Sequence, residues 1–146
     1  MALKRISILI GIFIVLISGY PSWGEDWTLL DQNESGKHYY DRESIRKNNQ
    51  DHILVRMLEF PDPEIIRAAE ELLPYIKGFS HMINEIEIDC QRRVYLLKRA
   101  CYLNKEARLI YDSRDKEAKF KPIVFRPIPR DTVIDKLSQI VCQPVP

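Results

Sequence analysis

The clearest strand pattern in this chain is the nine-residue segment HILVRMLEF, residues 52–60. Apolar side chains occupy both its odd and its even positions. Ile53 and Val55 would lie on one side of an extended chain, and Leu54 and Leu58 on the other. A strand that is apolar on both sides is typical of the middle of a covered sheet. We therefore expect residues 52–60 to form a central strand.

Segments with strand character precede and follow this central strand. Residues 27–30 and 37–41 flank an Asn-Glu-Ser-Gly turn at 33–36, and this pattern predicts an N-terminal hairpin. From residue 85 the chain alternates between acidic and apolar side chains, which predicts a strand that leaves its acids in water. The acids are Glu85, Glu87 and Asp89, and the expected buried set is Ile86, Ile88 and Cys90.

The second half of the chain predicts further strands. Residues 92–103 form a long β-prone stretch that we expect to pair with 107–111 around the turn at 104–106. The segment 122–129 carries apolar residues between prolines, so it can be an edge strand at most.

Two segments have the signals of helices. Asp62 is a candidate N-cap before Pro63, and apolar residues recur at helical spacing as far as Pro74, which kinks or ends the helix. Near the C-terminus, Thr132 begins a capping-box pattern that leads into the apolar face of a closing helix. Together these patterns predict an α+β fold: an antiparallel sheet of about five to six strands with two packed helices, one at the C-terminus.

Residues 1–24 have the pattern of a secretory signal peptide. Two basic residues precede an almost wholly apolar core at 6–17, which is about a dozen residues long, whereas a membrane span needs ~20. Small residues stand before the expected cleavage site, after Gly24. We expect a cleaved signal and one exported domain at 25–146, with an uncleaved N-terminal anchor as the alternative. No cysteine follows the apolar core, so a lipoprotein signal is not supported.

Export changes the interpretation of the three cysteines, because two of them are expected to pair outside a reducing cytosol. The pattern places Cys90 and Cys101 along one extended stretch. Their Cα atoms would have to come within about 7 Å, which requires a tight reversal between them. We favour Cys90–Cys142, which leaves Cys101 free. A metal site is not indicated, since no CxxC, HxxxH or HExxH spacing occurs.

The net charge is only +1, but charge is segregated along the chain. Residues 25–90 carry seven Lys/Arg and fifteen Asp/Glu, whereas residues 91–130 carry twelve and four. The basic half could form a surface for polyanions or acidic partners. Alternatively, the two halves face each other across neighbouring strands and neutralise one another. The small net charge gives no support for nucleic-acid binding.

The densest basic cluster lies at 92–99, where alternation along a strand would place Arg93, Tyr95 and Arg99 on one exposed face. The alternate aliphatic residues would then face the core. An aromatic side chain between flexible cations is typical of an interaction surface. We expect these three residues to contact a protein or a polyanionic surface ligand, unless acids on an adjacent strand neutralise the arginines.

The sequence has no pattern typical of an enzyme. His38, His52 and His81 stand without a neighbouring Ser, Cys or carboxylate at a known catalytic spacing, so we expect surface or packing roles for them. Glycine-rich phosphate loops are absent from the sequence as well. We therefore expect a non-catalytic protein without a cofactor.

A set of landmarks recurs in a particular order along the chain. They are Trp27, then Lys37-His-Tyr-Tyr-Asp41 with Ser44-Ile45, Ile53-Leu-Val-Arg-Met57, Ser80 ahead of Glu85-Ile-Glu-Ile-Asp-Cys90, Tyr111-Asp112, and Ile128-Pro129 before a helix that ends at Val141-Cys142. This ordered set, spanning about residues 26 to 143, resembles the surface-adhesin protein E family of bacterial exported proteins. The resemblance implies an antiparallel sheet with flanking helices and supports the Cys90–Cys142 pairing. Two features depart from the family pattern: a longer helical segment at 63–76 and the additional Cys101.

The resemblance also implies a role in adhesion. We therefore expect an exported, non-catalytic, adhesin-like module that recognises another macromolecule in the periplasm or at the cell surface. Outer-membrane association and homodimerisation would be compatible with this role. One alternative is a periplasmic accessory protein that supports assembly of an envelope or redox complex. Another is a thiol-dependent factor that acts through Cys101.

Overall fold

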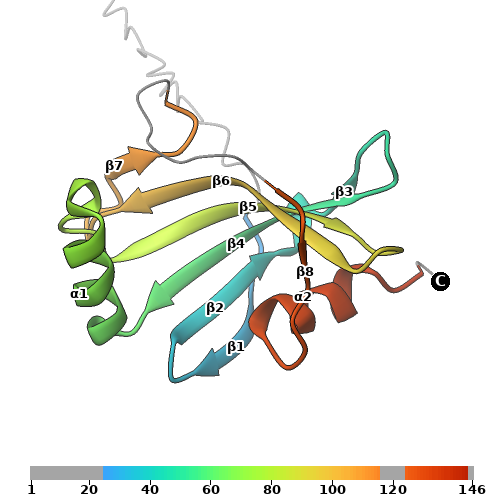
Figure 1. The fold of residues 1–146 in the computed structure, drawn as a ribbon, viewed down its shortest axis with the longest axis horizontal. Helices are drawn as coiled ribbons and strands as arrows, with labels where there is room; N and C mark the ends of the chain where they lie inside the picture. The colour runs from blue at the N-terminus through green and yellow to red at the C-terminus, as the bar shows by residue number, and fades with distance from the viewer. Residues whose placement is uncertain (1–24, 116–123, 145–146) are drawn as a thin grey trace, which may run out of the picture.

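The computed structural model describes residues 25–115 and 124–144 (Figure 1). Its centre is one antiparallel sheet in which six strands follow one another in the order β1-β2-β4-β5-β6-β7, with β3 beside β4 and β8 beside β6. The strands are β1 (Trp27–Asn33), β2 (Gly36–Asp41), β3 (Arg46–Lys47), β4 (Ile53–Pro61), β5 (His81–Asp89), β6 (Val94–Leu103), β7 (Leu109–Asp112) and β8 (Arg126–Pro127). The helices are α1 (Pro63–Leu72) and α2 (Val133–Val141), and short 3₁₀ turns η1 (Arg42–Ser44) and η2 (Pro74–Ile76) complete the elements. The expected α+β class is confirmed.

Strand β4 is central, as its sequence predicts, because it pairs with β2, β3 and β5. Its odd positions Ile53, Val55 and Met57 are buried on the face that α2 covers, which we call the inner face. Its even positions are half-buried or exposed, on the face opposite α2, which we call the outer face. Among the described residues, neither helix covers the outer face. This differs from the covering on both sides that the apolar pattern predicts.

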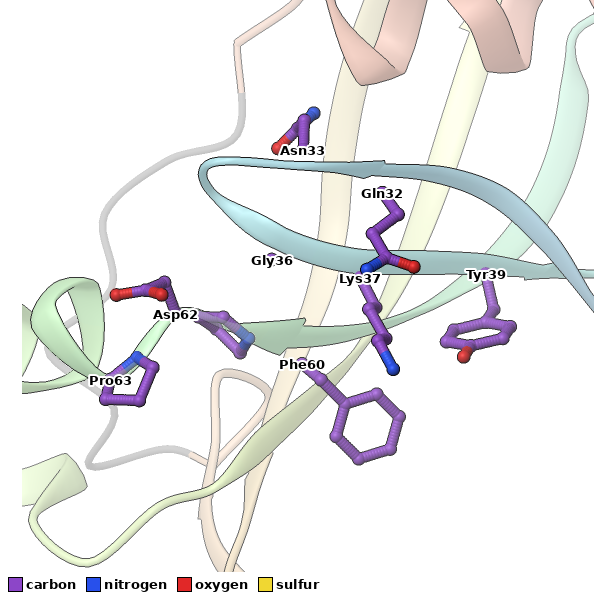
Figure 2. Close-up of a pocket in the computed structure, with 9 residues that line it drawn as sticks. Gln32, Asn33, Gly36, Lys37, Tyr39, Phe60, Asp62 and Pro63 are labelled. Atoms are coloured by element: carbon purple, nitrogen blue, oxygen red, sulfur yellow. The ribbon is translucent and has the colours of Figure 1, made fainter.

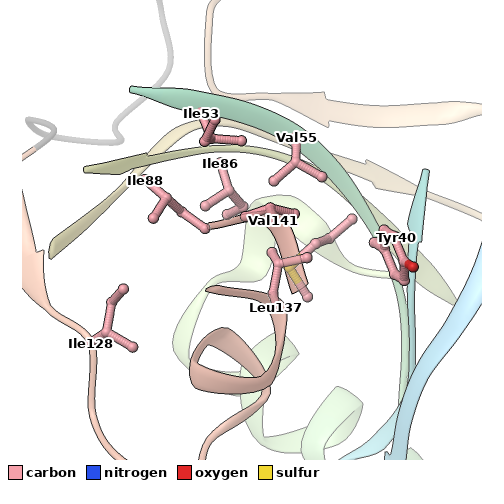
Figure 3. Packing of buried hydrophobic residues seen from close by; sticks show 9 residues of the cluster. Tyr40, Ile53, Val55, Ile86, Ile88, Ile128, Leu137 and Val141 are labelled. Atoms are coloured by element: carbon pink, nitrogen blue, oxygen red, sulfur yellow. The ribbon is translucent and has the colours of Figure 1, made fainter. Parts of the chain in front are cut away.

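The main core lies between the inner face and α2. Figure 3 shows Leu137 and Val141 of α2 directed at isoleucines and valines of β4 and β5. Leu137 and Ile88 are wholly inaccessible to solvent. At ~25 cal/mol per Å² of apolar surface, such contacts are the main stabilising term for this helix. An ion pair between Lys136 and Asp31 of β1, 2.6 Å, adds a polar contact at the edge of the helix.

A second, smaller apolar cluster lies at the other end of the inner face. It forms where the connection from α1 returns to the sheet through η2, and it contains the buried residues Ile76 and Phe79. Phe79 packs edge-on against Tyr102, with ring centres 5.2 Å apart, and Tyr75 packs against Tyr111 at 4.8 Å. Helix α1 lies at the ends of the strands (Figure 1) and contributes no buried residue.

Both helices begin at the residues that their sequence signals predict. The Asp62 side chain accepts a hydrogen bond from the Glu64 amide, and Thr132 accepts one from the Asp135 amide. Helix α1 ends at Leu72, before Pro74, which cannot donate the hydrogen bond that a continuing helix needs. The local signals therefore determine where the helices start and stop.

The acids of β5 are a correction to the sequence expectation. Glu87 and Asp89 are buried rather than solvated, because ionic partners from neighbouring segments surround them on the outer face. A second correction concerns β6, which begins at Val94 rather than at residue 92. Arg93 lies instead in the turn between β5 and β6, with a positive φ of 52°.

The disulfide joins Cys90 to Cys142, with Cα atoms 5.6 Å apart, as expected. It connects the turn after β5 to the C-terminus of α2 and so ties the helix to the inner face. The expectation that Cys90 and Cys101 share one extended stretch is wrong, because the turn between β5 and β6 separates them. Cys101 pairs with Ile83, near the opposite end of β5, and is a free thiol.

The expected signal peptide at 1–24 lies outside the described residues, as do residues 122 and 123 of the predicted edge strand. No helix within the described ranges is long and apolar enough to cross a membrane.

Candidate functional site

The outer face divides into two regions of different chemistry. Towards α1, apolar and aromatic side chains lie across β2, β4 and β5; we call this region the aromatic end, and its residues are Tyr39, Leu58, Phe60, His81 and Ile83. Towards β3 and β8, charged side chains pair across the strands. We call that region the ion-pair lattice, and its residues are Asp41, His52, Arg56, Glu85, Glu87, Asp89, Arg92, Lys98, Arg99, Asp112 and Arg114.

A groove of about 540 Å³ borders the aromatic end. One wall comes from the β1–β2 hairpin, through Gln32, Asn33 and Lys37, and the other from the end of β4 and the start of α1. Figure 2 shows Lys37, Tyr39 and Phe60 directed to the same side of the sheet from adjacent strands. The groove therefore combines aromatic rings, amides and a cation on an open surface.

Gly36 holds the hairpin close to β4. Its φ is +133°, and a Cβ at this position would lie 2.1 Å from the carbonyl oxygen of Phe60. Only glycine avoids both the strain and the collision. The backbone approach at Gly36 places Lys37 directly opposite Phe60 in the sheet, and the groove lies alongside this pair.

Aromatic contacts order the side chains of the aromatic end. Tyr39 meets Phe60 edge-on at 6.1 Å, and Phe60 stacks on His81 at 5.2 Å. Burial lowers the pKa of His81, which favours the neutral imidazole ring that stacks on Phe60. Phe60 nevertheless remains 41% exposed. An ordered, exposed aromatic group of this kind is suited to contact with another molecule.

Lys37 is the cation of the groove. It is exposed, and within the described part of the chain it has no salt-bridge partner. Its charge is therefore available to a ligand, in contrast to the paired arginines elsewhere on the outer face.

In the ion-pair lattice, Arg99 lies between two carboxylates, at 2.5 Å from Asp112 and 3.4 Å from Glu85. Arg99 donates hydrogen bonds to Asp112, and these hold the pKa of Asp112 below its usual value and raise the pKa of Arg99. Arg56 pairs in the same way with Asp41, which is fully buried. These arginines already have partners, so their charge is used within the molecule.

His52 connects two more acids of the lattice. Its Nδ1 lies 2.8 Å from Glu87 and its Nε2 lies 3.3 Å from Asp89. Burial raises the pKa of Glu87, but hydrogen bonds from His52 and Lys98 outweigh this, so the pKa of Glu87 lies below its ordinary value. Sequence reasoning missed these contacts because His52 and Glu87 are separated by 35 positions.

The three residues expected to form a binding face occupy different environments. Arg93, in the turn before β6, pairs with Asp135 of α2 at 2.9 Å. Tyr95 packs against the main core on the inner face. Arg99 lies on the outer face within the ion-pair lattice. An irregularity in the β5–β6 pairing skips Lys98 and shifts the alternation, which a strict two-residue period cannot anticipate.

The structure also locates Cys101 and His38, two other residues considered from the sequence. The Cys101 thiol is half-buried, and burial raises its pKa, which opposes formation of a reactive thiolate. His38 is buried on the inner face and bonded to Glu59 at 3.0 Å, 21 positions away. The described residues contain no cluster of His, Cys, Asp and Glu that could hold a metal ion.

Sequence reasoning did not identify the groove. Tyr40 is buried on the inner face, whereas its neighbour Tyr39 lines the groove on the outer face. The available signal was an aromatic residue, Phe60, at the end of the central strand and just before a helix cap. This position brings a large ring to the rim of a sheet.

Comparison with known proteins supports one family. A protein-family model for surface-adhesin protein E matches residues 27–143, which is most of the chain. The comparisons with curated proteins and with solved structures found no match. Membership of an adhesin family suggests an exported or cell-surface protein without enzymatic activity. From the matched range and the sheet with its C-terminal helix, we conclude that this chain belongs to the surface-adhesin protein E family.

Proposed function

We propose that this protein is an exported, adhesin-like module that binds another macromolecule through the aromatic end of its outer face. The observation that carries the proposal is the exposure of Phe60, 41%, within an ordered row of rings on a face that no described helix covers. Burying such a ring against a partner removes apolar area from water and is a main source of affinity at interfaces. The groove beside it supplies amides and a cation for orientation.

The partner that we propose is a protein or a polyanionic ligand presented on a surface. Lys37 supports an anionic contact because its charge has no partner among the described residues. Arg93 and Arg99 are weaker candidates for this contact, since carboxylates of the same chain already pair with them. Tyr95 is weaker still, because it packs against the core.

The location that we propose is the periplasm or the cell surface, after removal of residues 1–24. Fractionation of the producing cell tests this directly. Exposure to protease on intact cells would support adhesion, whereas recovery only from the soluble periplasm would support the accessory role. The family gives no support to that alternative.

Adhesion is tested with beads coated with residues 25–146. We expect the beads to attach to a plate covered with basement-membrane extract several-fold better than beads coated with albumin. Phe60→Ala should reduce attachment to the albumin level, because it removes the exposed ring. Lys37→Gln should weaken attachment and remove its dependence on salt.

Ile140→Ala is the matched control. Ile140 lies on α2 and is 42% exposed, almost the same as Phe60, but it is far from the groove in the sequence and on another element. It should leave attachment unchanged. Equal losses for Phe60→Ala and Ile140→Ala, or no attachment by the unaltered protein, would contradict the proposal.

A further inference from the structure

A polar cluster interrupts the inner face between the main core and the aromatic cluster beside η2. His38 of β2 lies directly opposite Glu59 of β4, and Asn84 of β5 reaches Glu59 from the next strand. Ser35, in the β1–β2 turn, completes the cluster through its contact with His38. Polar groups on an apolar sheet face weaken a core unless they have a specific use.

The atoms of this cluster form a continuous relay. Ser35 Oγ lies 2.9 Å from His38 Nε2, and His38 Nδ1 lies 3.0 Å from Glu59 Oε1. The Asn84 amide donates to Glu59 Oε2 at 2.6 Å and so fixes the carboxylate. In this arrangement the Nδ1–H group donates to Glu59, which leaves Nε2 as an acceptor for the serine hydroxyl.

Burial and exposure in the cluster also fit a reactive hydroxyl. His38 is 6% exposed and Asn84 is 8% exposed, whereas Ser35 is in a surface turn and is only half-buried. Asn84 Oδ1 is a buried acceptor without a hydrogen-bond partner among the described residues. A buried orphan acceptor is rare in a purely structural network. The base is therefore buried, its carboxylate is half-buried, and the nucleophile is accessible.

We propose that Ser35 is a nucleophile, activated by His38 and Glu59, that accepts an acyl or phosphonyl group from an activated donor. The Ser35 oxygen attacks the electrophilic centre as its proton moves to His38 Nε2, and Glu59 stabilises the resulting imidazolium. With a fluorophosphonate, an O–P bond forms, the P–F bond breaks and fluoride leaves. The product is a stable adduct on Ser35.

The hydroxyl has a second neighbour. Asn33 Oδ1 lies 2.5 Å from Ser35 Oγ and also accepts the Ser35 amide hydrogen. The single hydroxyl proton is thus shared between Asn33 and His38. This competition limits the activation, so we expect the adduct to form slowly.

Ser80 provides an internal control for this chemistry. Ser80 Oγ lies 2.7 Å from His81 Nδ1, but no carboxylate bonds to the other nitrogen of that ring within the described ranges. Ser80 is half-buried, as Ser35 is. Each hydroxyl also has a second acceptor, Asn33 for Ser35 and the Leu103 carbonyl for Ser80, so the carboxylate behind the imidazole is the difference that the comparison tests.

The test is labelling of residues 25–146 with an alkyl fluorophosphonate, followed by intact mass and peptide mapping. We expect one adduct, on Ser35, and no adduct on Ser80. Ser35→Ala should abolish labelling, and His38→Gln and Glu59→Gln should each slow it by about tenfold or more. Ser80→Ala should label as the unaltered protein does.

Thermal unfolding of each variant shows whether it is folded. If His38→Gln does not fold, Glu59→Gln still tests the relay, because it has the same shape and can still bond to Asn84. The proposal is overturned if the folded protein forms no adduct, if Ser80 labels as fast as Ser35, or if the folded Glu59→Gln variant labels at the unaltered rate.

Discussion

The two regions of the outer face share one sheet but differ in whether their charged side chains have partners within the molecule. In the ion-pair lattice, each described arginine faces a carboxylate of a neighbouring strand or turn, so the charges are neutralised inside the molecule. At the aromatic end, Phe60 and Lys37 point outward without such partners. Charge density alone is therefore a poor guide to a binding surface. Substitutions should lower stability in the lattice and should affect binding at the aromatic end.

The largest effect is expected at Asp41. This carboxylate is fully buried, pairs with Arg56, and accepts the amide hydrogens of Asp26 and Glu43. Asp41→Ala leaves the partly buried Arg56 with only the more distant contact to Glu25, 3.6 Å, and removes the cap of η1. We expect the free energy of unfolding to fall by about 3 kcal/mol. Urea denaturation measures it, and a fall of less than about 1 kcal/mol would show that the lattice contributes little.

The second-largest loss of stability is expected from the double variant Arg93→Glu with Arg99→Glu. Arg99 should dominate, because reversal places a third acid beside Asp112 and Glu85. We expect a loss of about 2 kcal/mol, which for a domain of this size lowers Tm by several degrees. Retention on a heparin column should not change, since these arginines are already paired.

Lys37→Glu with Lys105→Glu is the matched control for that pair. Both lysines are exposed, and neither has a salt-bridge partner among the described residues. The control should leave Tm unchanged and shorten retention on heparin. The reverse result would be shorter heparin retention for the arginine variant and a lower Tm for the lysine variant. It would mean that the lattice, rather than the groove, recognises anions.

A smaller loss of stability is expected when the pH falls. The pKa values of Glu87 and Asp112 are held below their ordinary values in the folded protein. Their stabilisation is therefore fully present above the unfolded pKa of about 4 and is lost as pH falls through the lower folded values. Tm should fall as pH drops below about 5. Asp112→Asn should show a shallower decline, and an equal slope would exclude Asp112 as a source of the pH dependence.

The smallest change in stability is expected at the aromatic end. Phe60→Ala removes a ring that is 41% exposed and outside the main core, so Tm should remain within about 3 °C of the unaltered protein. Circular dichroism during heating measures this shift. A much larger fall would mean that the row of rings is a structural element of the sheet, and the loss of bead attachment could not then be assigned to contact with a partner.

Much of the fold could be predicted because it depends on local signals. The central position of β4 follows from its apolar run, and the helix starts follow from Asp62 and Thr132. The disulfide could be predicted from the expected export and from the positions of Cys90 and Cys142. The candidate site was harder to predict, because Phe60 and Lys37 come together only when Gly36 allows β2 to pack closely on β4.

The sequence by itself therefore determined the order of the strands and helices, their caps, the disulfide and the family. These features depend on periodicity and on the conformational preferences of single residues. Only the tertiary structure decided which acids are buried, where the alternation of β6 shifts, and which cations keep a free charge. The physical reason is that such pairs join residues far apart in the chain, as Arg56 joins Asp41 and His38 joins Glu59. Their partners depend on strand register, and a single irregular residue in the pairing can change that register.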